Sequence, residues 1–252
     1  MAGGSLVDSG QRTASNDGTG EVTSGNTDPA LGVLGAQTLL SAGALVQQAR
    51  AFNDGTSAAC AGVVGAGGLV QIGPGGDCTV TGAQPGGVVV NLPVGLTLAA
   101  DAILAKCTAS SNGTTTGSAS IVNGRIFNPA LPAITILALP LSAAPNSGLS
   151  VPGVLSLLLN KQTTGTGPVP NPVPPPPEVT GPFIDVEALE ITVLGQTVNV
   201  SIGEASCGPN AVAEVIPLVP PEGIPLAVAI LAGSGGVAWL WLRRRRAAAV
   251  AP

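Results

Sequence analysis

Two carboxylates are the strongest catalytic candidates in this sequence. Asp185 and Glu187 lie two positions apart, so on a strand they would share one face, as the carboxylate pair of a glycosidase does. A solvated strand start explains the same residues without any reaction. Glycosidase sites also present aromatic platforms, and this chain has only three Phe, two Trp and no Tyr. We expect no catalytic activity and keep a secreted, membrane-tethered, carboxylate-dependent hydrolase as the alternative.

Other catalytic and metal sites lack their residue types. Histidine is absent, which removes Ser-His-Asp, Cys-His and histidine–metal chemistry. Lys106 and Lys161 are the only lysines, and neither follows a Ser-x-x pattern. Turns at 53–55 (Asn-Asp-Gly) and 73–77 (Gly-Pro-Gly-Gly-Asp) could offer oxygens to calcium, but turn chemistry explains both without an ion. We expect no metal and no cofactor.

Four cysteines form the clearest constellation: Cys60, Cys78, Cys107 and Cys207. An even number in an exported chain indicates two disulfides, and the spacing fits no zinc motif. Cys207 follows a hairpin beyond a proline-rich segment and needs a partner before that segment. We therefore favour Cys107–Cys207 and Cys60–Cys78, and the two other pairings stay open.

Two tripeptides fit the glycosylation acceptor pattern, Asn112-Gly-Thr114 and Asn199-Val-Ser201. The first is expected at a turn tip, where an acceptor would be accessible. The second falls within a predicted strand, and we interpret it as incidental.

An internal repeat with an offset of 58 residues organises the elements that carry these residues. Residues 40–46 (Leu-Ser-Ala-Gly-Ala-Leu-Val) match 98–104 (Leu-Ala-Ala-Asp-Ala-Ile-Leu), and Asp54-Gly55 matches Asn112-Gly113. Both dipeptides favour tight hairpin turns because they tolerate positive φ. Returning runs follow at 57–64 and 117–126. We predict two equivalent β-hairpins; chance similarity in an Ala- and Gly-rich chain is the alternative.

The remaining elements also predict strands. Residues 40–50 have helical propensity, but the turn and the repeat favour a strand. The Gly-Pro-Gly-Gly-Asp loop predicts a hairpin of 70–72 with 78–81. Further expected elements are a strand at 88–98 bent at Pro93, apolar runs at 134–141 and 154–159, the latter ending at Asn160-Lys161, and a hairpin at 191–202.

A proline-rich stretch, 163–182, separates the last hairpin from the earlier strands. Alone it indicates a polyproline spacer. A two-stranded hairpin is marginal by itself, so the last one must join the earlier strands, and the stretch becomes a surface excursion. The prediction is an all-β, sandwich-like or layered antiparallel domain at 30–210, preceded by a disordered, irregular segment at 1–29 with structure starting near Leu31.

The C-terminal segment predicts membrane attachment. A linker at 211–224 precedes residues 225–242, which begin at Pro225 and carry no charge. As a helix, they would span roughly 27 Å, close to the hydrocarbon thickness of a bilayer. Trp239 and Trp241 suit the interface, and Arg243, Arg244, Arg245 and Arg246 would keep 243–252 in the cytoplasm and the preceding chain outside. A buried core helix is the alternative.

The net charge of the chain limits the classes of partner that it is expected to bind. Without those four arginines, five basic residues stand against 14 acidic ones, a net charge of −9. Nucleic-acid binding requires a basic patch, so we expect no nucleic acid. The membrane, through the C-terminal helix, is the expected partner, together with an unknown extracellular partner.

The tail resembles the tripartite sorting signals of surface proteins, with a short motif, a hydrophobic span and a basic cluster. Together with NDGTSAACAG, LAADAILAKCTAS and LEITVLGQTVNVSIGEASC, the chain from 31 to 246 resembles the choice-of-anchor P family of high-GC Gram-positive bacteria. The resemblance implies a secreted protein and a sorting enzyme that acts on the tail. In place of the sortase motif Leu-Pro-x-Thr-Gly, this chain has Val219, Pro220, Pro221, Glu222 and Gly223, closer to the Pro-Glu-Pro tails of exosortase substrates. Tail cleavage and a permanent anchor are both open.

These expectations combine into one functional hypothesis: a structural or adhesive cell-envelope protein without catalysis. Self-association of the membrane span through residues 233–236 (Gly-Ser-Gly-Gly) is a further alternative. No signal peptide follows Met1. Signal trimming, a misplaced start codon and insertion directed by the C-terminal segment would each explain this, and we favour a missing true N-terminus.

Overall fold

The protein is an antiparallel all-β structure in a computed structural model that describes residues 13–14, 20–29, 40–92, 95–168, 180–194 and 198–209. All of these residues belong to one compact unit, Met1–Ala213. Its strands are β1 (Val22–Pro29), β2 (Leu40–Ala42), β3 (Ala44–Ala51), β4 (Ser57–Val64), β5 (Leu69–Ile72), β6 (Cys78–Thr81), β7 (Val88–Leu92), β8 (Leu96–Ala100), β9 (Ala102–Ala109), β10 (Thr115–Val122), β11 (Arg125–Phe127), β12 (Thr135–Ala138), β13 (Ser147–Val151), β14 (Leu155–Pro168), β15 (Thr180–Val193) and β16 (Val198–Cys207).

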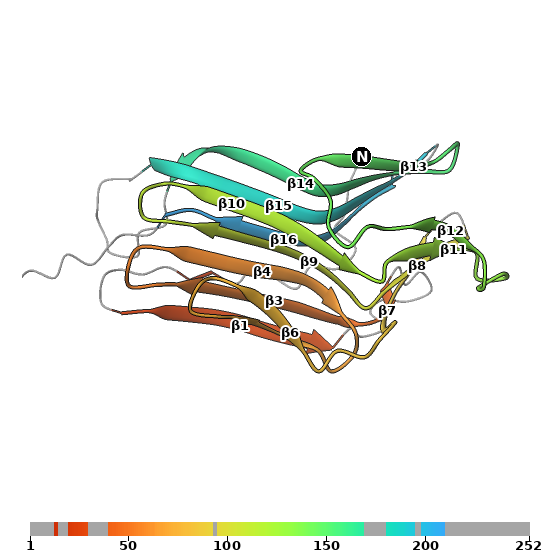
Figure 1. Cartoon of the computed structure of the whole chain (residues 1–252), viewed down its shortest axis with the longest axis horizontal. Helices are drawn as coiled ribbons and strands as arrows, with labels where there is room; N and C mark the ends of the chain where they lie inside the picture. The colour runs from red at the N-terminus through yellow and green to blue at the C-terminus, as the bar shows by residue number, and fades with distance from the viewer. Residues whose placement is uncertain are drawn as a thin grey trace, which may run out of the picture. The chain divides into compact units, whose positions relative to one another are not determined.

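The strands form three larger sheets and one hairpin (Figure 1). The central sheet has the order β1-β3-β4-β9-β10, the end sheet β12-β11-β8-β7-β2, and the covering sheet β13-β14-β15-β16. Among the described strands, β5 and β6 pair only with each other. The predicted all-β, sandwich-like fold is confirmed.

The internal repeat corresponds to two equivalent hairpins. Strands β3 and β9 have the same bounds after an offset of 58, as do β4 and β10. The two hairpins lie side by side because β4 pairs with β9. Only Gly43 separates β2 from β3 and only Asp101 separates β8 from β9, so each repeat passes from the end sheet into the central sheet at the same point. The prediction of two equivalent hairpins is confirmed, including strand over helix for 40–50.

The central sheet is covered on both faces. Strands β14, β15 and β16 pack over β4, β9 and β10 on one face, and β5 and β6 pack over β3 and β4 on the other. Strand β9 serves both cores by alternation: Ile103 and Ala105 join the larger core, whereas Ala102 and Leu104 join the smaller one. The larger core also takes buried residues from the end sheet, so one apolar interior links all three sheets.

A row of three residues, one on each of three neighbouring strands, interrupts the alternation of buried and exposed side chains in the covering sheet. On β15, Val186 and Ala188 are buried, and then Leu189 and Ile191, so the buried set shifts by one position. Neighbouring registers place Asn160 and Gly203 opposite Ala188 on β14 and β16. Asn160 and Gly203 have φ of 51° and 69°. We call Asn160, Ala188 and Gly203 the crease.

The N-terminal expectation needs a correction. Residues 22–29 were expected to be irregular with the rest of 1–29, but they form β1, and each pairs with a residue of β3. Backbone hydrogen bonds to β3 hold this edge strand, so it forms without apolar alternation in its sequence.

Residues 88–98 form a hairpin instead of one bent strand. Strand β7 pairs with β8 antiparallel. Gly95 adopts φ 72°, and its N–H donates to the Leu92 carbonyl at 3.1 Å, so the chain reverses here. Pro93 lies outside the described residues.

Strands β14 and β15 are both longer than predicted. Strand β14 does not end at Asn160-Lys161 but continues through the crease to Pro168, where it pairs with Thr180 of β15. The surface excursion expected at 163–182 therefore loses both ends to this ladder, and its remainder, 169–179, lies outside the described residues. The added ladder consists mainly of Thr and Gly, with Pro168 at its end and Pro182 opposite Thr166. Strand β16 pairs with β15 only from Ile184 onward, so Pro182 lies where β15 has a neighbour on one side alone, as a proline in a sheet requires.

The other strand predictions are confirmed, with two exceptions. Strand β12 is shorter than the apolar run 134–141, and the returning run 117–126 is divided between β10 and β11, which belong to different sheets. The linker at 211–224, the span at 225–242 and the tail at 243–252 lie outside the described residues. Within the described ranges, the structure contains no helix of the length and hydropathy needed for a membrane span.

Candidate functional site

The Cys107–Cys207 disulfide joins the central sheet to the covering sheet. Cys107 on β9 and Cys207 at the end of β16 are 1% and 3% exposed, with a Cα–Cα distance of 5.8 Å. The bond closes a segment of 100 residues. In the chain-entropy model a closure of this length stabilises the fold by about 5 kcal/mol. Ser57 Oγ adds a hydrogen bond to the Gly208 carbonyl at 2.6 Å beside the same strand end.

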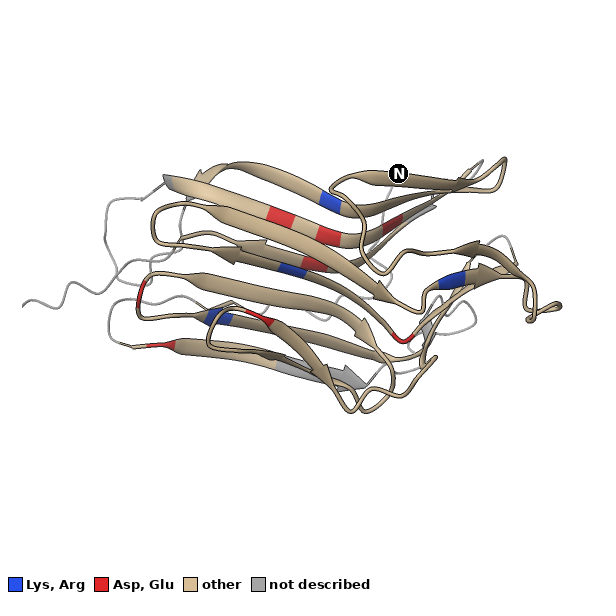
Figure 2. Cartoon of the chain, in the orientation of Figure 1, with Lys and Arg blue, Asp and Glu red and all other residues tan. Residues whose placement is uncertain are grey.

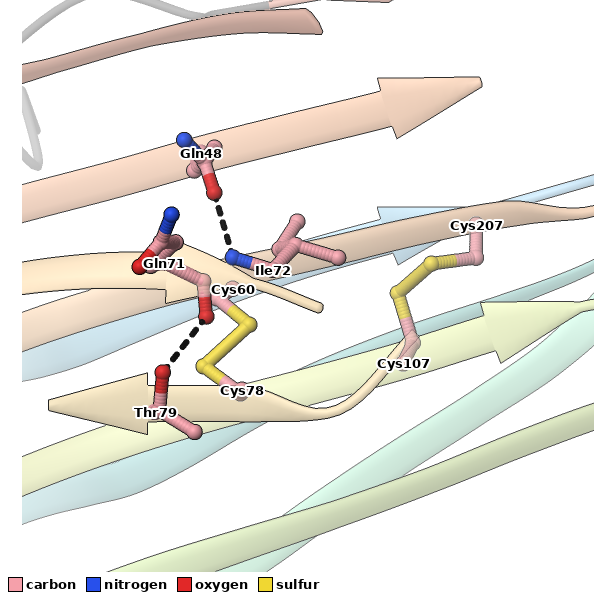
Figure 3. The surroundings of a disulfide bond; sticks show 8 residues. All are labelled: Gln48, Cys60, Gln71, Ile72, Cys78, Thr79, Cys107 and Cys207. Atoms are coloured by element: carbon pink, nitrogen blue, oxygen red, sulfur yellow. Dashed lines mark hydrogen bonds between the residues drawn. A yellow bond between two sulfur atoms is a disulfide. The ribbon is translucent and has the colours of Figure 1, made fainter. Parts of the chain in front are cut away.

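The Cys60–Cys78 disulfide joins the opposite face of the central sheet to the β5–β6 hairpin (Figure 3). Its Cα–Cα distance is 6.1 Å, and Cys60 is 1% exposed. Two side chains of β3 hold the same hairpin by its backbone. The Ile72 N–H donates to Gln48 Oε1, and Arg50 Nη1 donates to the Ile72 carbonyl at 2.8 Å.

The disulfides therefore bind the two covering layers to one central sheet. Cys60 and Cys107 lie on neighbouring strands, since Cys107 pairs in register with Ala59. They point to opposite faces, because Cys60 joins the smaller core and Cys107 the larger one. The favoured pairing is confirmed, and no cysteine is free.

A cluster of charged side chains lies at the crease, on the outer face of the covering sheet. Lys161 Nζ contacts Glu187 Oε1 at 2.7 Å and Glu190 Oε2 at 2.9 Å, and Ser201 Oγ donates to Glu187 Oε2 at 2.6 Å. Glu187 and Glu190 are three residues apart on β15, and only the crease allows them to face the same side. Figure 2 shows acidic positions on β15 beside a basic one on β14.

This arrangement is suited to bracing strands rather than to acid–base chemistry. The hydrogen bonds from Lys161 to Glu187 and then to Glu190 raise the pKa of the lysine ammonium above its ordinary 10.5. The amine therefore holds its proton and is no nucleophile at neutral pH. Both oxygens of Glu187 are already engaged, one by Lys161 and one by Ser201.

The predicted carboxylate pair has the predicted placement. Asp185 and Glu187 lie on β15 and are both half-buried. Glu187 belongs to the charged cluster, which also contains Lys161, Glu190 and Ser201, none of which was named as its partner from the sequence. The signal for these partners was weak, because it required the register of β14 and β16 against β15.

The two repeat turns share their backbone hydrogen bonds and one side-chain bond, and in the second turn Ser110 Oγ also donates to Asn112 Oδ1. The N–H groups of Thr56 and Thr114 each donate at 2.9 Å to the side-chain oxygen two residues earlier, on Asp54 and Asn112. At 53–55 this contact engages one of the two Asp54 carboxylate oxygens. Within the described ranges, no three His, Cys, Asp or Glu side chains converge as metal ligands.

The two glycosylation acceptors lie where the sequence predicts them. Asn112 is exposed at the tip of the β9–β10 hairpin, and Asn199 lies within β16. Residues assigned to the membrane anchor and the processing motif, Pro220 to Gly223, Pro225, Trp239, Trp241 and Arg243 to Arg246, lie outside the described residues.

Three residues that hold neighbouring segments by hydrogen bonds to their backbone were not identified from the sequence. Gln48 and Arg50 form hydrogen bonds with the backbone of Ile72. Arg50 also forms an ion pair with Glu21 at 2.6 Å, and its guanidinium lies over the Phe52 ring at 4.7 Å. Asn160 is 3% exposed and donates to the Ala143 carbonyl at 2.8 Å. An asparagine directly after an apolar run was the available signal, since Asn tolerates positive φ.

No protein-family model, curated protein or solved structure matches this chain.

Proposed function

We propose that this chain is a structural or adhesive protein of the cell envelope, exported and attached through its C-terminal segment, and without catalytic activity. The observation that carries the proposal is the placement of the disulfides. Each face of the central sheet is cross-linked to the layer that covers it, through largely buried sulfurs. Disulfides of this kind form and persist in oxidising, extracytoplasmic surroundings.

The polar chemistry of the described surface supports the same function. The one cationic amine of the charged cluster is fixed between two carboxylates, and Glu187 is held through both oxygens. Such a cluster binds three neighbouring strands together. A scaffold that must keep its shape outside the cell benefits from these cross-strand links.

The C-terminal sequence supplies the attachment. Residues 225–242 are uncharged and long enough for a membrane span, and four arginines follow them. The Pro-Pro-Glu-Gly motif at 220–223 resembles a processing signal. On this proposal, the resemblance to the choice-of-anchor P family accounts for both features.

Fractionation of the native cells tests the proposal. We expect the protein in the envelope fraction, released only by detergent or by cutting the tail, and accessible to protease added to intact cells. A product ending near 220–223 and joined to envelope material would establish processing. A full-length product extracted by detergent would establish a permanent anchor. Soluble full-length protein in the cytosol would contradict both.

The hydrolase alternative predicts a different result. Glycoside or ester hydrolysis by the purified full-length protein, lost on Asp185→Asn or Glu187→Gln with the fold intact, would exclude a purely structural role. Ser201→Ala is the matched control, because it removes one contact of Glu187 and no carboxylate.

A further inference from the structure

The β5–β6 hairpin is joined to the central sheet by side chains instead of a strand ladder. Within the described ranges, neither of its strands pairs with a strand of the central sheet. Cys78 carries the disulfide to Cys60. Its partner in the hairpin register, Ile72, forms hydrogen bonds with Gln48 and Arg50. These links therefore meet at the last residue pair before the turn of the hairpin.

The other end of the hairpin is fixed and contains two facing glycines. The Asp101 carbonyl accepts from the Gly65 N–H at 3.0 Å, and the Asp101 carboxylate accepts from the Gly86 N–H. Between these contacts and the paired strands lie Gly67 and Gly82, with φ of 79° and 72°. A Cβ at Gly82 would lie 3.0 Å from the Gly67 carbonyl oxygen, so the two glycines are opposed. Glycine accommodates the backbone rotations that a hinge requires.

The two disulfides differ in accessibility. Cys78 is half-buried, whereas Cys60, Cys107 and Cys207 are 1%, 1% and 3% exposed. Cys107 and Cys207 both belong to the larger core, between the central and covering sheets. Access to a sulfur is one of the factors that decide which disulfide exchanges with an external thiol. Accessibility therefore favours exchange at Cys60–Cys78, with attack at Cys78.

We propose that the Cys60–Cys78 disulfide is a redox-sensitive latch, opened by low-molecular-weight thiols, and that the released β5–β6 hairpin rotates about Gly67 and Gly82 and uncovers the smaller core. A thiolate bonds to Cys78 Sγ, and the electron pair of the broken S–S bond passes to Cys60 Sγ, which takes a proton from water. A second thiolate bonds to the sulfur of the first thiol and releases Cys78 Sγ, which is also protonated. Two thiols are thereby oxidised to one disulfide, and the protein disulfide is reduced by two electrons.

Opening of this latch leaves the rest of the fold cross-linked. The Cys107–Cys207 disulfide still joins the central and covering sheets. The surface uncovered is the apolar face of the central sheet, with Val46, Ala58 and Leu104 among its residues. Gln48 and Arg50 still bind the backbone of the hairpin, so reduction makes opening more frequent without unfolding the protein. The proposal does not depend on how the chain is attached to the cell.

Reduced glutathione, added at rising concentration to the oxidised full-length protein in mild detergent, tests the site of attack. Free thiols are alkylated at intervals, and the peptides are identified by mass. We expect Cys60 and Cys78 to be released while Cys107 and Cys207 stay bonded, and the glutathione adduct to form on Cys78 with Cys60 free. Reduction of Cys107–Cys207 first, simultaneous loss of both disulfides, or an adduct on Cys60 alone would overturn the proposal.

Amide hydrogen exchange, measured at a glutathione concentration that opens only Cys60–Cys78, tests the movement of the hairpin. We expect exchange at 69–81 to accelerate by about a hundredfold, the entropic effect of a closure of 18 residues, with exchange in β9 and β14 unchanged. Reoxidation should restore the protection. Unchanged exchange at 69–81, or acceleration throughout the central and covering sheets, would be incompatible with a hinged hairpin.

The variant Gln48→Leu separates the disulfide from the hydrogen bonds. It removes the acceptor of the Ile72 N–H, so it should accelerate exchange at 69–81 in the reduced protein and have little effect while the disulfide is intact. Gln47→Leu is the matched control, because residue 47 lies on the opposite face of β3, and it should behave as the unaltered protein in both states. An equal effect of Gln48→Leu in both states would contradict a latch at Cys60–Cys78.

Discussion

At the scale of single residues, Gly203 shows how closely the two main layers approach. A Cβ at this position would lie 2.8 Å from the Ala61 carbonyl oxygen and 3.1 Å from the Gly62 Cα on β4. The backbone also has φ of 69°, which disfavours any side chain. Small residues on both sheets therefore allow direct backbone packing where the covering sheet creases.

We predict that Gly203→Ala lowers the free energy of unfolding by about 2–4 kcal/mol, from the positive φ and the overlap with β4 together. Gly153→Ala is the matched control, because Gly153 has φ of 72° but a Cβ added there would have no neighbour within 4 Å. It should cost only about 1 kcal/mol. Denaturant unfolding compares the two, and equal losses would contradict the packing argument.

The raised pKa of Lys161 predicts how the stability of the protein changes with pH. Its pKa is raised in the folded protein, so the stabilisation from its ion pairs is fully present below the ordinary value of 10.5 and is lost as the pH rises above it. Because the side chain is 34% exposed, the cluster contributes only about 1 kcal/mol. Lys161→Met should therefore be less stable than the unaltered protein at pH 8, and this difference should shrink at strongly alkaline pH. A difference that grows with pH would contradict this assignment.

At the scale of elements, the repeat explains which parts of the fold were predictable. The Asp-Gly and Asn-Gly turns and the offset of 58 identified both central hairpins, because a tight turn between β-forming runs is a local signal. The disulfide pairing followed from the order of the strands. Those inferences required only residues near each other in sequence or the order of elements along the chain.

The parts that could not be predicted depend on pairing between distant strands. Strand β1 has no apolar alternation and exists through its ladder with β3. The charged cluster depends on the crease, where Asn160 and Gly203 shift the side-chain alternation on their strands. The continuation of β14 past Asn160 likewise depends on the crease and on pairing with β15. A sequence pattern does not reveal register, so neither the cluster nor the strand length could be read from it.

The repeat makes its own prediction about turns. Since Asp54 and Asn112 accept the same hydrogen bond, Asp54→Asn and Asn112→Asp should each change stability by less than about 0.5 kcal/mol. Asp54→Ala should lose about 1 kcal/mol, because the bond to the following threonine is removed. Asn112→Ala should lose at least as much, because Asn112 Oδ1 also accepts a hydrogen bond from Ser110 Oγ. Thermal unfolding of the four variants checks this. A smaller loss for Asn112→Ala than for Asp54→Ala would contradict this assignment.

The two disulfides should stabilise the fold by different amounts and over regions of different extent. Cys107→Ala/Cys207→Ala should cost about 5 kcal/mol and loosen amide exchange throughout the central and covering sheets. Cys60→Ala/Cys78→Ala should cost about 3 kcal/mol and loosen mainly residues 69–81, since Gln48 and Arg50 still hold Ile72. If loss of Cys60–Cys78 loosened the covering sheet equally, the hairpin would not be a separate layer.

At the scale of the whole molecule, the described part is a layered β-structure whose interior consists mainly of Ala, Val, Leu and Ile. Aromatic residues contribute little, with Phe52 the only aromatic among the buried core residues of the described ranges. Cross-links through both faces of the central sheet supplement this core of small residues. The same cross-links make the structure suited to oxidising surroundings, as the proposed envelope function requires.

The most direct test is a disulfide map of the protein isolated from its native cells, alkylated before any reduction. We predict that no cysteine takes up the reagent and that the unreduced peptides join Cys60 to Cys78 and Cys107 to Cys207. Four alkylated thiols, or either of the other two pairings, would contradict the account of an exported structure with each face of its central sheet cross-linked to a covering layer.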